Sequence, residues 1–143
     1  MLYTLKYAGK KYAYDSASGA VVATNALQFK MFGAILPPLT AVCPTSLRYE
    51  LAKFDSLDVE EAYEYIYSLA CDGILYKEDD GKVRIATEGE NACTDLALAG
   101  ELIALAFADA SAEFGFEVVG NALSEELNAI AKGEAVKLGK KII

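Results

Sequence analysis

The sequence predicts an α+β protein, and three of its features carry this prediction. Its first 24 residues alternate apolar and polar side chains in short runs separated by Gly, Ser and Asp, which is typical of strands and tight turns. From residue 25 onward, apolar side chains recur at helical spacing. The runs 74–77 and 82–86 flank an Asp-Gly pair, which favours a β-hairpin.

The N-terminal strands are predicted as a three-stranded meander. The runs 2–7, 11–14 and 20–24 contain the β-branched and aromatic residues, and the turns fall at Gly9-Lys10 and at 15–19. Consecutive side chains of a strand point to opposite faces, so either Val21 or Val22 belongs to the core whatever the function.

Three helices are predicted next. Asn25 is suited to cap a helix that runs to about Leu36, where Pro37-Pro38 stops it. Thr45 or Ser46 caps a short helix through Phe54. Asp58 is the expected N-cap of a longer helix over 58–72, after which Gly73 is a natural C-terminal residue.

Three helices followed by a β-hairpin make a winged-helix arrangement. We therefore predict a winged-helix-like domain over residues 1–86, with the hairpin 74–86 as its wing. Residues 87–143 are predicted as a helical region of unknown role. It holds a buried Ala/Leu helix over 91–114, a short extended piece over 116–120, a helix from Ser124 to about Ala131, and a tail that forms a strand or a mobile arm.

Composition excludes several classes of function. The 143 residues are 54% hydrophobic, which is enough for a core, and they include no histidine, which removes Ser-His-Asp, Cys-His and imidazole–zinc chemistry. A net charge of -8 disfavours sequence-independent nucleic-acid binding. No secretion signal is recognisable, and three carboxylates interrupt the most apolar stretch, so we expect no membrane span; they are Asp95, Glu101 and Asp109.

Cysteine spacing indicates a reducing compartment. Cys43, Cys71 and Cys93 are odd in number and far apart, and no CxxC or CxxxCxxC pattern occurs. We expect them to be small buried hydrophobic residues of a cytoplasmic protein, with no metal site and no cofactor.

Charge is segregated along the chain. Residues 1–57 carry six basic and three acidic side chains, whereas residues 58–126 carry three basic and 17 acidic ones. One interpretation is a solvated acidic face; the other is a surface on which a basic ligand lies against helix 58–72.

One segment resembles a known family. The pattern Tyr12-Ala13-Tyr14-Asp15, Ser18-Gly19, Val21-Val22, followed by the acidic helix from Asp58 and by Gly73-Ile74-Leu75-Tyr76, is similar to the PqqD-like RiPP recognition element over residues 2–78. It looks closest to the version at the N-terminus of radical-SAM maturases that install thioether crosslinks. The chain departs from those maturases after residue 86, where it has no CxxxCxxC motif, and in its loop 37–46.

The resemblance implies peptide binding without catalysis. In that family the leader segment of a ribosomally made precursor peptide adds as a strand to the edge of the third strand, beside the third helix. The resemblance further implies delivery of the precursor to a separate modifying enzyme, such as a radical SAM enzyme. The residues implied as peptide-binding come from the edge strand 20–24 and from the groove helix: Ala20, Val21, Val22, Ala23, Thr24, Ala62, Tyr63, Ile66 and Tyr67.

Three other functions stay open at this point. A structural protein could use helix 91–114 as an oligomer interface, which includes a homodimer. A winged-helix regulator would need an exposed basic or amide-rich recognition helix, and helix 58–72 has none. An enzyme could use the carboxylates around the start of the long helix, which are Glu88, Glu90, Asp95 and Glu101, although acidic residues there also suit the helix dipole.

Overall fold

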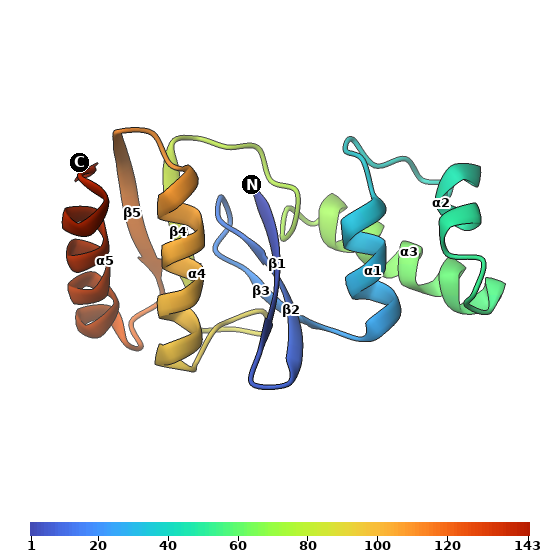
Figure 1. Cartoon of the computed structure of the whole chain (residues 1–143), viewed down its shortest axis with the longest axis horizontal. Helices are drawn as coiled ribbons and strands as arrows, with labels where there is room; N and C mark the ends of the chain where they lie inside the picture. Colours follow the sequence, from blue (N-terminus) through green and yellow to red (C-terminus); the bar gives the residue numbers. More distant parts are fainter.

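The computed structural model describes all residues, 1–143, and shows an α+β fold with five helices and two small sheets (Figure 1). No helix combines the length and the apolar character needed to cross a membrane. The elements in chain order are β1 Leu2–Tyr7, β2 Lys10–Asp15, β3 Val21–Thr24, α1 Ala26–Ala34, α2 Thr45–Glu50, α3 Ser56–Cys71, β4 Lys82–Ala86, α4 Leu96–Asp109, β5 Glu113–Val119, α5 Ser124–Leu138 and β6 Lys141–Ile142.

The meander predicted at the N-terminus is confirmed. Strands β1, β2 and β3 form an antiparallel sheet in that order. Gly9 and Gly19 adopt positive φ angles of 77° and 84° in the two connecting turns, a backbone conformation that glycine adopts without steric cost.

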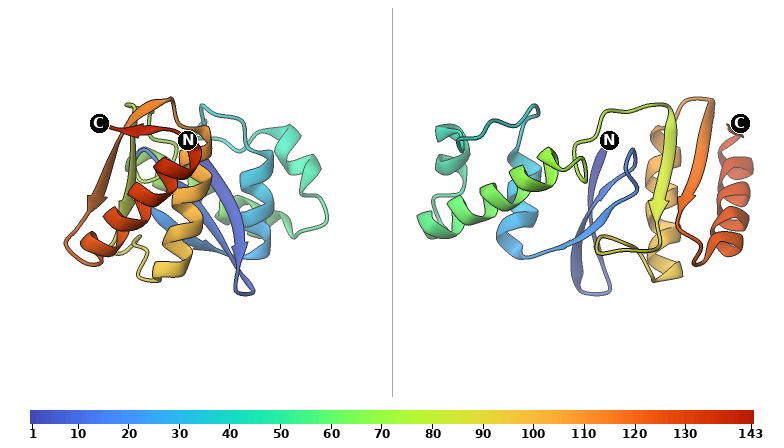
Figure 2. Two further views of the ribbon diagram at one scale, coloured as in Figure 1. Left: turned by 60° about the vertical axis from the view of Figure 1, so that its left-hand side comes forward. Right: turned by 180° about the vertical axis from the view of Figure 1, so that it is seen from behind.

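The meander is buried on both faces. Ala13 and Val22 face a cluster formed with α1, α2 and α3, whereas Tyr14 and Val21 face a second cluster formed with β4, α4, β5 and α5. Figures 1 and 2 show the sheet as the middle layer, with α1 and α3 on one side and α4 on the other. Val21 and Val22 are therefore both core residues, each of a different core, where one of the two was expected to be core.

Helices α1 and α3 form where they were expected, with one correction to their caps. Asn25 caps α1 through a reciprocal pair of hydrogen bonds with Gln28, at 2.7 and 3.0 Å. Asp58 was expected to cap α3, but the helix begins two residues earlier and Asp55 caps it instead. The Asp55 carboxylate accepts the N–H groups of Leu57 and Asp58, so Asp58 lies within the first turn.

Helix α2 is shorter than predicted. It ends at Glu50 rather than Phe54, and the position that precedes it is Pro44 rather than Thr45 or Ser46. Pro44 makes no side-chain cap because the side chain of proline has no hydrogen-bonding group, although its backbone carbonyl accepts the N–H groups of Leu47 and Arg48.

The predicted β-hairpin wing over 74–86 is wrong. Residues 74–77 form no strand: Tyr76 has a φ of 57°, and Asp15 accepts the N–H of Lys77 at 2.9 Å. Strand β4 pairs in parallel with β5 on one side, and the turn after β2 occupies its other side. Both edges of β4 are therefore taken by segments distant in sequence.

The C-terminal region is also less helical than predicted. Strands β4, β5 and β6 form a parallel sheet, because α4 and α5 return the chain to run in the same direction each time. Helix α4 spans Leu96–Asp109 instead of 91–114, and the extended piece expected over 116–120 is a strand that begins earlier, at Glu113. Helix α5 continues past Ala131 to Leu138, so most of the expected tail is helical. The strands on the two sides of the predicted boundary at residue 86 are in direct contact.

Candidate peptide-binding edge

Strand β3 lies at one edge of the meander, and its backbone defines the candidate site. The N–H of Asp15 donates to the carbonyl of Ala20 at 3.0 Å, which sets the alternation of this antiparallel ladder. Val22 and Thr24 therefore form the hydrogen bonds to β2. Val21 and Ala23 direct their N–H and C=O groups outward. The outward N–H of Val21 is already bonded to the carbonyl of Asn91 at 3.0 Å. The open part of this edge is therefore at Ala23, whose side chain is also exposed.

A hollow of about 480 Å³ opens where β3 runs into α1. Asn25, Leu27 and Gln28 line it from the start of α1, Phe54 lines it from the segment between α2 and α3, and α3 supplies Asp58, Glu61 and Ala62. Helix α3 crosses behind α1 at this level (Figure 1). The hollow thus combines apolar side chains with two exposed carboxylates.

The residues implied as peptide-binding occupy different places. Ala20, Val21 and Val22 are buried, Ala23 is exposed and Thr24 is half-buried with a hydroxyl that has no hydrogen-bond partner. On α3, Ala62 lines the hollow, whereas Tyr63 and Ile66 lie in the core and Tyr67 is half-buried. Of these residues, Ala62 lines the hollow, Ala23 and Thr24 come directly before Asn25 of its lining, and Tyr63 and Ile66 belong to the core.

Two of the three tyrosines of α3, Tyr63 and Tyr67, pack against each other. The rings of Tyr63 and Tyr67 are nearly parallel, with centroids 6.4 Å apart. The Tyr63 hydroxyl donates to the carbonyl of Thr40 at 2.6 Å, which ties the loop 37–46 to α3. The Cys71 thiol one turn further along raises the pKa of the Tyr67 phenol. These contacts give both tyrosines a structural role.

A buried carboxylate holds the turn that leads into β3. Asp15 is fully buried, and its Oδ1 accepts the N–H groups of Ala17 and Ser18 at 2.8 and 3.2 Å, while Oδ2 accepts that of Lys77. The Ser18 hydroxyl donates to the carbonyl of Ile74 at 2.6 Å. Tyr14 is buried as well, and this burial raises the pKa of its phenol. Both Tyr14 and Asp15 of the motif therefore act inside the fold.

Two of the four carboxylates considered for catalysis, Asp95 and Glu88, accept hydrogen bonds from backbone N–H groups. Asp95 caps α4 by accepting the N–H groups of Ala97 and Leu98. Glu88 accepts the N–H groups of Asn121 and Ala122 at 2.9 and 3.2 Å. No group of three or more Cys, Asp or Glu side chains is placed to hold a metal ion.

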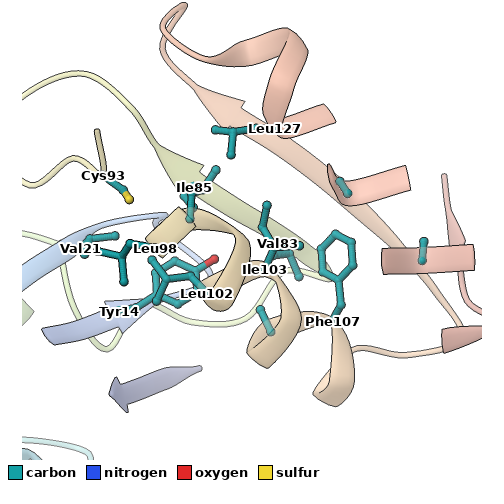
Figure 3. Packing of buried hydrophobic residues seen from close by; sticks show 14 of the residues in the cluster. Tyr14, Val21, Val83, Ile85, Cys93, Leu98, Leu102, Ile103, Phe107 and Leu127 are labelled. Carbon is teal, nitrogen blue, oxygen red and sulfur yellow. The ribbon is translucent and has the colours of Figure 1, made fainter. Parts of the chain in front are cut away.

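Helix α4, considered as an oligomer interface, contributes most of its apolar side chains to the chain's own core. Figure 3 shows Leu98, Leu102 and Ile103 of α4 among Tyr14 and Val21 of the meander and Val83 and Ile85 of β4. Leu96 and Leu105 are the large apolar residues that α4 leaves at least a third exposed.

The hollow was not predicted from the sequence. Glu61 belonged to the acidic helix that supported the resemblance, but nothing in the sequence placed it beside Phe54 and the start of α1. The signal that did exist is the pair Asn25 and Gln28, which fixes where α1 begins.

Comparison of the sequence with models of protein families finds no match, and comparison with curated proteins finds none either. The arguments that follow therefore depend on the residues and their geometry.

Proposed function

We propose that this protein binds an extended peptide without catalysing its modification, and that the peptide adds as a strand to the outer edge of β3. In this proposal the N-terminal half, without the expected wing, acts as a recognition domain of the PqqD-like kind. The peptide is the leader segment of a ribosomally made precursor, which is delivered to a separate modifying enzyme such as a radical SAM enzyme. The observation that carries the proposal is the open backbone at Ala23 beside the hollow.

Strand addition supplies docking through main-chain hydrogen bonds and specificity through side-chain pockets. Ala23 offers one N–H and one C=O, whereas Asn91 occupies the N–H of Val21. A bound strand therefore engages the Ala23 end of β3 and reaches the hollow at the start of α1.

The lining of the hollow indicates the kind of peptide. Leu27, Phe54 and Ala62 favour an apolar side chain, and the carboxylates of Asp58 and Glu61 favour a Lys or Arg next to it. We therefore expect a leader with an apolar residue beside a basic residue, which agrees with the acidic charge of residues 58–126.

The test uses synthetic leader segments of the small peptides encoded beside the gene, titrated against the full chain. We expect a micromolar or tighter Kd, and a loss of about ten-fold or more in Ala23→Pro, because proline removes the outward N–H that the fold itself does not use. Ala23→Ser keeps this N–H and is the matched control.

A second pair of variants tests the side-chain contribution. Glu61→Gln is expected to weaken binding of a basic leader and to reduce its salt dependence, while Glu64→Gln, which changes an exposed carboxylate of α3 outside the hollow, leaves binding unchanged. The proposal fails if no leader segment binds, or if Ala23→Pro binds as tightly as the unaltered chain.

A further inference from the structure

The outer edge of β3 is closed at both of its ends by the chain itself. At the start of the strand, the carbonyl of Asn91 accepts the N–H of Val21 at 3.0 Å. Just past its end, the side-chain Oε1 of Gln28 accepts the N–H of Asn25 at 3.0 Å. Ala23 lies between these two positions, and no backbone group of the chain bonds its outward N–H and C=O. The open part of the edge is thus bounded on both sides.

The two closures differ in how firmly they are built. The bond to Gln28 is half of a reciprocal pair, because Gln28 in turn donates its N–H to the side chain of Asn25 at 2.7 Å. Breaking that pair would undo the start of α1. The bond from Val21 to Asn91 instead joins the strand to an irregular segment between β4 and α4. The edge can therefore lengthen at its Val21 end without the loss of a helix cap.

The segment that bonds Val21 runs between two fixed points. We call residues 88–92 the strap. Before it, the buried Thr87 donates its N–H to the end of β5 at 3.0 Å, and after it the buried Cys93 donates its N–H to the end of β4 at 2.8 Å. Figure 3 shows Cys93 and Val21 in the same hydrophobic cluster. Both ends of the strap are therefore held in place independently of its contact with β3.

The strap itself makes few contacts. Residues 88–90 are exposed, and Asn91 and Ala92 are half-buried. The bond between Val21 and Asn91 is the one backbone–backbone hydrogen bond that the strap makes. The Glu88 carboxylate also accepts two N–H groups that follow β5, at 2.9 and 3.2 Å. A segment with few buried apolar contacts and a single backbone bond opens at a lower free energy than the core strands.

We propose that the strap is autoinhibitory: it closes the Val21 end of the β3 edge and is released when a peptide strand extends its pairing to Val21. This role rests on the peptide binding proposed above. The carbonyl of Asn91 bonds the N–H that a carbonyl of an added strand would bond, so the strap and the peptide compete for it. Release makes the N–H and C=O of both Val21 and Ala23 available. Because an edge that is open for a fraction of the time binds with an affinity reduced by that fraction, the closed strap weakens leader binding.

Amide hydrogen exchange tests whether the strap opens by itself. Gly89 has a φ of +100° and open space around an added Cβ, so Gly89→Ala strains the closed strap without a clash, and release relieves the strain. Gly139→Ala is the matched control, with a φ of +68° and open space at the end of α5. We expect the Val21 amide to exchange faster than that of Val22, which bonds β2, about ten-fold faster still in Gly89→Ala, and at an unchanged rate in Gly139→Ala. If Val21 exchanges in step with Val22 in all three proteins, the strap opens only with the whole fold and the proposal is overturned.

Titration with the leader segments described above separates this proposal from that of peptide binding. The Kd of Gly89→Ala is expected to be up to about ten-fold lower than that of the unaltered chain, and the Kd of Gly139→Ala to equal it. An equal Kd in all three proteins overturns the autoinhibition and leaves strand addition at Ala23 standing. The absence of binding to all three overturns the peptide binding, and with it the inhibitory role, even where exchange shows that the strap opens.

Discussion

The amide of Ala86 donates to the carbonyl oxygen of Gly19 across 2.8 Å, which joins the turn before β3 to the edge of β4. Gly19 has a φ of +84°, and a Cβ added there would lie 2.9 Å from that same amide nitrogen. The turn and the strand approach so closely that no side chain fits between them. The turn at Ser18-Gly19 is therefore packed directly against β4.

Gly19→Ala is expected to destabilise the fold severely. The left-handed backbone costs an alanine about 1–2 kcal/mol, and forcing Cβ into the backbone of β4 adds about 1–3 kcal/mol. Gly9→Ala is the control, because Gly9 has a similar φ of +77° but open space around the added Cβ. Urea unfolding measures both. Equal losses of unfolding free energy in the two variants would show that β4 moves aside and that Gly19 is not tightly packed against it.

Asp80→Asn is expected to lower stability in a way that depends on pH. Two hydrogen bonds from Arg84, at 3.0 and 2.6 Å, lower the pKa of Asp80 from 3.8 to about 2. A carboxyl whose pKa is lowered on folding stabilises the protein fully above its unfolded pKa, and loses this contribution as pH falls through the folded one.

Melting curves of the unaltered chain and of Asp80→Asn should therefore differ by a constant amount above about pH 5 and converge between about pH 4 and pH 2. Asp79→Asn, which leaves the Arg84 pair intact, should show no such convergence. A difference that persists unchanged at pH 2 would contradict the role given to the Asp80–Arg84 pair.

Lys140→Met is expected to destabilise the C-terminal half by about 1–3 kcal/mol, because a charged donor that satisfies the last carbonyls of a helix is lost. The Lys140 ammonium donates to the carbonyls of Phe107, Ala108 and Ala110 at 2.7–2.9 Å, at the end of α4. Chemical denaturation measures the loss. Lys137→Met, an exposed position in the last turn of α5, is expected to have a much smaller effect.

Local features of the sequence predicted local features of the structure. Asn25 marked the start of α1, and Gly73, with its positive φ, follows α3 as expected. The exception is Asp58: Asp55, Ser56, Leu57 and Asp58 offered two aspartates that could both cap a helix, and the earlier one does so.

Pairing between distant segments could not be predicted in the same way. The Asp-Gly pair at 80–81 indicated a hairpin, but Val83 and Ile85 pair with residues more than thirty positions away in β5. Their alternation is the same whether the neighbouring strand is local or distant, so the pattern fixes which side chains face inward and not which strand lies beside them. The candidate edge at β3 was predicted as an edge, whereas Asn91 at its start arises from packing that no local pattern encodes.

The adjacent residues Val21 and Val22 face two different hydrophobic clusters, so one short strand forms part of the wall of both. Opening either cluster uncovers one side of the meander and removes support from the other side. Neither the half of the molecule on the α1 and α3 side of the meander nor the half on the α4 side can therefore unfold and leave the other half intact. A strand that binds at the outer edge of β3 would therefore affect the packing on both faces of the sheet, and the two halves would respond to it as a single cooperative unit.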